Sequence, residues 1–148
     1  MEIIKHKSSD WDLHFMKIAN VVSEMSKDPS TQVGAVIVKD KVIYGTGYNG
    51  FPKNVPDYLR DYEDRPTKLS KIIHAEENAI KNSLTVPEGF TVYVYPFMPC
   101  TRCFQLLKQN NVSKIVTNFV AKYSKWESDW EMVRKQCREL GIEVVELV

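Results

Sequence analysis

The fold is decided by residues 33–48, which read VGAVIVKDKVIYGTGY. Residues 33–38 form a short apolar run rich in β-branched side chains, which is typical of a buried strand. Lys39, Asp40 and Lys41 interrupt this run as a polar turn, and residues 42–48 read as the returning strand. Because a turn this short joins antiparallel neighbours, the stretch predicts a β-hairpin.

Helical and strand patterns alternate on both sides of this hairpin. The elements that we expect are helices at 8–27, 75–83, 100–109 and 126–140, and strands at 33–38, 42–48, 91–95, 114–117 and 142–147. Strands that alternate with helices imply parallel pairing through helical crossovers. Residues 1–148 are therefore predicted to form a single α/β domain with three α/β/α layers and a mixed five-stranded sheet.

Residues 49–70 stand apart from this alternation. They contain Gly50 and the prolines Pro52, Pro56 and Pro66 among many charged residues. Glycine and proline residues at this density predict one long loop, and long loops in compact domains are usually functional or mobile.

Composition excludes several classes of protein. The 148 residues are 43% hydrophobic and 26% charged, as in ordinary globular domains, and their net charge of +1 does not favour a nucleic-acid partner. No apolar run approaches the roughly 20 residues that a membrane helix needs, and the N-terminus shows no secretory signal. Three cysteines, two of them three residues apart, favour a reducing compartment over a disulfide framework. We therefore expect a cytoplasmic protein without a membrane partner.

Two short motifs carry the chemistry. His74 and Glu76 stand at one predicted helix start, and Cys100 and Cys103 stand at the next. Residues three apart share a helix face, and a helix N-terminus favours the thiolate form, so both sulfurs can bind one ion. One imidazole and two thiolates form a zinc ligand set that leaves the fourth position open for catalysis. Glu76 would then shuttle the proton that such a site must move.

Each motif alone has a simpler interpretation. A CxxC pair can be a redox pair or half of a structural zinc site, and H-x-E by itself carries no information. A four-ligand site would need His6, His14 or Cys137. Cys137 lies on an apolar helix stripe, where we expect an inert buried thiol, and His14 is expected to be a packing or surface residue. Together, H-x-E followed by P-C-x-x-C is the zinc deaminase signature.

Four stretches extend this match: SKDPSTQVGAV at 26–36, GTGYNGFP at 45–52, HAEENAI at 74–80 and PCTRC at 99–103. In these stretches the chain resembles the deoxycytidylate (dCMP) deaminase family of the cytidine deaminase-like superfamily, from about Trp11 to Val145. The zinc motif belongs to the whole superfamily. The GYNGFP stretch and the continuation after HAE point to dCMP deaminases.

The resemblance implies a hydrolase that converts dCMP to dUMP and ammonia and thereby supplies dUMP for dTMP synthesis. It implies one catalytic Zn2+ held by His74, Cys100 and Cys103, with Glu76 as the proton shuttle. It also implies substrate contacts by Asn49, Ala75 and Tyr123. From the residues alone, Asn49 could instead be a turn residue beside Gly50, and Tyr123 an aromatic side chain packed on the sheet edge.

The resemblance further implies a homo-oligomer, with a hexamer favoured, that dCTP activates and dTTP inhibits, with Mg2+ accompanying the triphosphate. The residues of this effector or phosphate loop would be Lys27, Gly47, Tyr48 and Gly50. The alternative is a loop that only closes over substrate. Further phosphate-binding candidates are Arg60, Arg65 and Lys71, although charged loop residues are more often simply solvated.

Three functions remain open on the sequence. The first is deamination of dCMP, which the GYNGFP loop favours. The second is deamination of another substrate: dCTP, a modified dCMP, or a tRNA adenosine, for which a basic surface would be expected. The third is a non-catalytic zinc module, which would leave Glu76 without a purpose.

Overall fold

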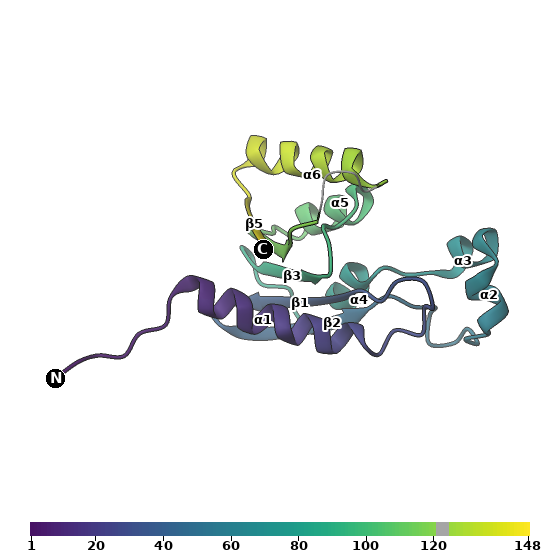
Figure 1. Cartoon of the computed structure of the whole chain (residues 1–148), viewed down its shortest axis with the longest axis horizontal. Coiled ribbons are helices and arrows are strands. Elements are labelled where there is room, and N and C mark those ends of the chain that lie inside the picture. Colours follow the sequence, from purple (N-terminus) through teal and green to yellow (C-terminus); the bar gives the residue numbers. More distant parts are fainter. Residues whose placement is uncertain (121–124) are drawn as a thin grey trace.

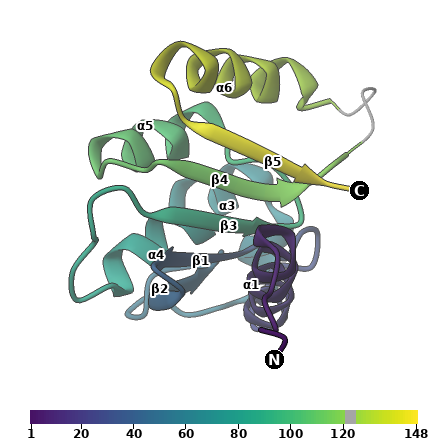
Figure 2. The same cartoon turned by 90° about the vertical axis from the view of Figure 1, so that its left-hand side faces the viewer.

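The computed structural model describes residues 1–120 and 125–148, and a five-stranded sheet forms its centre, in the order β2-β1-β3-β4-β5 (Figure 1 and Figure 2). The strands are β1 (Gly34–Lys39), β2 (Val42–Tyr48), β3 (Thr91–Tyr95), β4 (Lys114–Asn118) and β5 (Glu143–Leu147). β1 pairs antiparallel with β2 and β3, whereas β3, β4 and β5 pair in parallel. The predicted hairpin and mixed sheet are confirmed. The sequence pattern does not predict that β1 lies between β2 and β3.

Helices cover both faces of the sheet and complete the predicted three layers. They are α1 (Ser8–Ser23), α2 (Leu59–Glu63), α3 (Arg65–Lys71), α4 (Ala75–Asn82), α5 (Thr101–Gln109) and α6 (Glu127–Leu140). Alternate residues of β1 decide the layers: Val36 and Val38 pack on the side of α1, whereas Ala35 and Ile37 pack on the side of α4, in a buried cluster that extends to α5 and α6. The core therefore lies on both sides of β1. Every residue of this strand except Lys39 is buried.

The segment expected as one long loop contains two short helices, so that prediction is wrong in part. α2 and α3 stand at the end of the molecule opposite the N-terminal tail (Figure 1). Pro66 lies in the first turn of α3, where a missing N–H does no harm, and the Asp64 carboxylate accepts a hydrogen bond from the Thr67 backbone N–H. Proline here starts a helix instead of preventing one.

The first helix is also shorter than predicted, because α1 ends at Ser23 instead of Lys27. The side chains after α1 form hydrogen bonds with residues outside the helix: the Ser26 hydroxyl donates to the Asn49 carbonyl, and the Asp28 carboxylate accepts from the Ser30 backbone N–H. Such side-chain bonds to the backbone compete with helical hydrogen bonds, so the chain forms a loop here instead of another helical turn. Among the described residues, no helix is long and apolar enough to cross a bilayer.

Candidate metal centre and adjoining cavity

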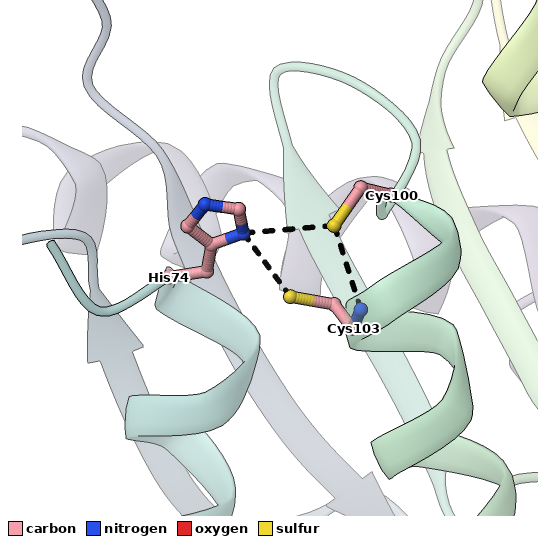
Figure 3. Close-up of side chains that lie close together, drawn as sticks. All are labelled: His74, Cys100 and Cys103. Carbon is pink, nitrogen blue, oxygen red and sulfur yellow. Dashed lines mark hydrogen bonds between the residues drawn. The ribbon is translucent and has the colours of Figure 1, made fainter. Parts of the chain in front are cut away.

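Two neighbouring helix starts bring three metal-binding side chains together. His74 immediately precedes α4, Cys100 caps α5, and Cys103 lies in the first turn of α5. Figure 3 shows the imidazole and both sulfurs pointing toward one another from these two helices. The approach to His74 is held by a short antiparallel bridge in which the backbones of Gly50 and Ile73 exchange hydrogen bonds of 3.0 and 2.8 Å.

The spacing of the donor atoms fits zinc. The His74 Nδ1 atom lies 3.2 Å from the Cys103 Sγ atom and 3.6 Å from the Cys100 Sγ atom. In a tetrahedral site with Zn–N and Zn–S bonds of ordinary length, a nitrogen and a sulfur ligand are separated by about 3.5 Å. All three donor atoms lie within 4.8 Å of one another. The group can therefore hold one zinc ion with a fourth position to spare.

The electrostatics of the cluster favour a thiolate at Cys100. Hydrogen bonds from Cys103 and His74 lower the pKa of Cys100 to about 4, and the Cys103 backbone N–H also lies 3.4 Å from its sulfur. The hydrogen bond to Cys100 and burial raise the pKa of the Cys103 thiol. The pKa of His74 is raised, chiefly by its hydrogen bond with Cys100. One sulfur is thus ready to bind a cation at neutral pH, and the second lies beside it.

Glu76 is the buried acid of the site. It lies in the first turn of α4, and only 4% of its surface is exposed. Burial raises the pKa of its carboxyl group to about 7, against the opposing effect of the nearby His74. A carboxyl group in such surroundings can both accept and release a proton near neutral pH.

His74, Glu76 and Cys100 line a cavity of about 220 Å³, and aromatic side chains form one part of its wall. Phe97, Trp126 and Trp130 line it, and the Phe97 ring centroid lies 5.3 Å from that of Trp126 and 5.7 Å from that of Trp130. The cavity is thus large enough for a small planar molecule, which these rings can exclude from water. Ala75, completely buried at the start of α4, also lines it.

Polar residues line another part of the cavity. Asn49 and Asp28 belong to it and are both buried, and α3 contributes Arg65 and Lys68. Three hydrogen bonds hold the Asn49 amide: its Oδ1 accepts from the Val33 backbone N–H at 2.9 Å, while its Nδ2 donates to the Thr31 carbonyl and, at 3.3 Å, to Asp28. Asn49 is therefore part of the cavity wall, and the turn interpretation does not describe it.

The residues expected in an effector or phosphate loop are not brought to this cavity. Within the described chain, none of Lys27, Gly47, Tyr48 and Gly50 lines it. Lys27 is exposed and pairs with Asp57, and Tyr48 is 43% exposed. Gly47 faces α4, where an added Cβ would lie 2.3 Å from the Ala79 backbone nitrogen. Tyr123 lies outside the described residues.

Sequence reasoning missed two partners of the site. The Asp129 carboxylate of α6 accepts hydrogen bonds from the Thr101 backbone N–H (3.0 Å) and hydroxyl (2.8 Å), which holds the start of α5 between the two cysteines. Lys68 forms a 2.8 Å ion pair with the buried Asp28. The only sequence signal was a threonine inside the P-C-x-x-C motif, and its partner lies 28 residues away. Cys137 is buried in α6, as predicted.

Comparisons with known proteins agree with this site. Residues 9–119 match the family model described as the cytidine and deoxycytidylate deaminase zinc-binding region. An uncharacterized deaminase of Aliivibrio fischeri is 37% identical over 138 residues, which cover 92% of each chain. A probable deoxycytidylate deaminase of Caenorhabditis elegans is 49% identical over 106 residues, 68% of this chain and 53% of that protein.

Human deoxycytidylate deaminase is 39% identical over 115 residues, 72% of this chain and 64% of the human one. The chain thus spans between half and two thirds of the nematode and human relatives. Among solved structures, the dCMP deaminase from the cyanophage S-TIM5 in complex with dCMP and dUMP superposes with a TM-score of 0.74 at 25% identity, covering 96% of this chain and all of the phage chain.

The chain belongs to the cytidine and deoxycytidylate deaminase family. The family and the fold predicted from the sequence are confirmed.

Proposed function

We propose that this chain catalyses the hydrolytic deamination of dCMP, consuming one water molecule and releasing dUMP and ammonia, with one zinc ion held by His74, Cys100 and Cys103. The observation that carries the proposal is that buried Glu76 lines the same cavity as His74 and Cys100, while the Cys103 Sγ atom lies 3.2 Å from the His74 Nδ1 atom. The relatives named deoxycytidylate deaminases, and the phage enzyme in complex with dCMP and dUMP, support this nucleotide as the substrate.

Glu76 is the general base and general acid in this mechanism. Zinc, when bound, supplies a Lewis acid that lowers the pKa of a water molecule in the cavity. A carboxylate oxygen of Glu76 accepts one proton of this water as the water oxygen bonds to C4, and the resulting acid donates that proton to N3 of the ring. Glu76 then accepts the proton of the new C4 hydroxyl and donates it to the amino nitrogen, so that the C4–N bond breaks, C4 becomes a carbonyl and ammonia leaves. Burial keeps this carboxyl group able to hold a proton at neutral pH, since burial raises its pKa to about 7.

Asn49 offers one remaining hydrogen-bonding position to a substrate. Both N–H groups of its amide are donated to the chain, and Oδ1 accepts a single bond from Val33. An amide oxygen has two lone pairs, so Asn49 can still accept a hydrogen bond, but it cannot donate one. We propose that it accepts from a sugar hydroxyl, while the aromatic side chains of the cavity exclude water from the base. Ala75 and Tyr123 remain proposed substrate contacts.

The assembly and regulation that the resemblance implies are proposals as well. They comprise a hexamer in the cytoplasm, one deaminase domain over residues 1–148, activation by dCTP and inhibition by dTTP with Mg2+. Lys27 and Tyr48 are exposed and lie outside the lining of the cavity, which suits a separate effector site. Sedimentation and a rate titration at sub-saturating dCMP with each triphosphate test this, and a monomer indifferent to both would contradict it.

The function is tested by ammonia release from dCMP, dCTP, cytidine and a tRNA, together with elemental analysis. We expect about one zinc per chain and turnover chiefly of dCMP. Cys103→Ser should lose the metal and the activity, whereas Cys137→Ala, the control at the third cysteine, should keep both. Preferred turnover of the tRNA would favour the polymer deaminase, and zinc without turnover of any of the four would favour a binding module.

A further inference from the structure

The cationic side chains that were candidates for binding a phosphate, together with Lys68, differ in whether a carboxylate neutralises them. Three lysines are paired at 2.8 to 2.9 Å: Lys27 with Asp57, Lys68 with Asp28, and Lys71 with Asp61. Their positive charges are largely cancelled where they lie. They therefore add little net attraction for an anionic ligand.

The two arginines of α2 and α3 have different surroundings. The Arg60 guanidinium lies 4.6 Å from the ring centroid of Tyr58, its Nε is 3.9 Å from Asp61, and it is not part of the cavity lining. Arg65, the first residue of α3, does line the cavity. In the described part of the chain, no carboxylate lies within ion-pair distance of Arg65.

The cavity itself needs such a cation if a phosphate is to enter it. Three carboxyl groups line it, those of Asp28, Glu76 and Asp129, whereas its only cationic side chains among the described residues, apart from His74, are Lys68 and Arg65. Lys68 is committed to Asp28. A nucleotide phosphate, with close to two negative charges, would be repelled unless Arg65 met it. Its planar guanidinium can donate two parallel hydrogen bonds to one phosphate.

We infer that Arg65 is the residue that selects a 5′-phosphorylated substrate over the bare nucleoside, by binding the phosphate at the α3 side of the cavity. This inference rests on the proposed function and adds to it the residue that makes the substrate a nucleotide. Arg65 is exposed and forms no ion pair in the described structure, so replacing it should disturb neither the fold nor the metal centre.

The test compares dCMP with deoxycytidine as substrates of the wild type, Arg65→Gln, Arg65→Lys and the control Arg60→Gln. In Arg65→Gln, we expect the ratio of kcat/KM for dCMP to that for deoxycytidine to fall at least about tenfold, mostly through KM, because a hydrogen bond to a charged group is lost. Arg65→Lys should recover part of the ratio, and Arg60→Gln should keep all of it. Zinc content and melting temperature should match the wild type in all three variants.

Calorimetric titration with dUMP and with deoxyuridine gives a readout that needs no turnover. Arg65→Gln should weaken the binding of dUMP at least about tenfold relative to deoxyuridine. A ratio unchanged in Arg65→Gln, or one that falls equally in Arg60→Gln, would overturn the inference and leave the dCMP deaminase standing. A wild type that does not deaminate dCMP would instead overturn the proposed function, and this inference with it.

Discussion

Gly47 offers a test of how α4, the helix that contains Glu76, is placed on the sheet. α4 packs directly on β2, and a Cβ added at Gly47 would lie 2.3 Å from the Ala79 backbone nitrogen and 2.6 Å from the Ala75 carbonyl oxygen. Ordinary contact begins at about 3.5 Å, so Gly47→Ala requires a shift of about 1 Å between strand and helix. Neither neighbour can turn away, because both are backbone atoms.

The expected effect of Gly47→Ala is large for a single methyl group. Overpacking usually destabilises by about 1–3 kcal/mol, and a clash with helix backbone belongs at the upper end. For a chain of this length, about 3 kcal/mol corresponds to a fall in melting temperature of roughly 6–12 °C. Because α4 carries Glu76 and follows His74, a displacement of about 1 Å should also lower kcat by about a hundredfold.

Gly50→Ala is the matched control, three residues further along the same stretch. A Cβ there would meet the Tyr62 hydroxyl at 3.8 Å, which is an ordinary contact. Its unfolding free energy should stay within about 0.5 kcal/mol of the wild type. Urea unfolding, zinc content and ammonia release are measured on both variants. If Gly47→Ala is as stable and active as Gly50→Ala and loses only its response to dCTP or dTTP, the packing argument is refuted and the effector role is favoured.

Three other substitutions test the site and its surroundings. Glu76→Gln should keep its zinc while turnover of dCMP falls at least about a hundredfold, and an active, zinc-loaded variant would remove the proposed proton shuttle. Asp129→Ala loses both hydrogen bonds to Thr101, so the variant should be less stable by about 1 kcal/mol and should release zinc to a chelator faster than the wild type. An unchanged release rate would show that these two hydrogen bonds do not hold the zinc ligands in place. The hydrogen bond from Lys27 lowers the pKa of Asp57, so this carboxylate stabilises the fold above the pKa that it has in the unfolded chain, and its contribution is lost as the pH falls through the lower folded value. Urea unfolding should therefore separate Asp57→Asn from the wild type at neutral pH and bring the two together in acid, whereas a difference that is constant with pH would contradict this assignment.

Much of the fold follows from short stretches of sequence. The apolar run of 33–38 predicts a buried strand because only a strand covered on both faces tolerates such a run. The positions of Cys100 and Cys103 on one helix start follow from helix geometry, which needs no knowledge of the rest of the chain. The zinc motif can therefore be recognised from the order and spacing of its residues alone.

Other features depend on contacts between distant segments. Sequence spacing does not place Arg65 at the cavity while turning Lys27 and Lys71 toward Asp57 and Asp61. In the sequence, these three residues differ little, since each is a basic residue among polar neighbours. Which of them is neutralised by a carboxylate depends on ion pairs that form only in the packed chain.

By itself, the sequence determined the layers, the ligand types and the acid beside them, because each depends on residues within a few positions of one another. Only the tertiary structure decided that His74 meets Cys100, that Asp129 holds Thr101, and that β1 separates β2 from β3. Such pairings are set by how α4, α5 and α6 pack on one sheet. The physical reason is that local backbone geometry restricts only neighbours, whereas contacts across 26 or 28 residues form when buried surfaces fit together.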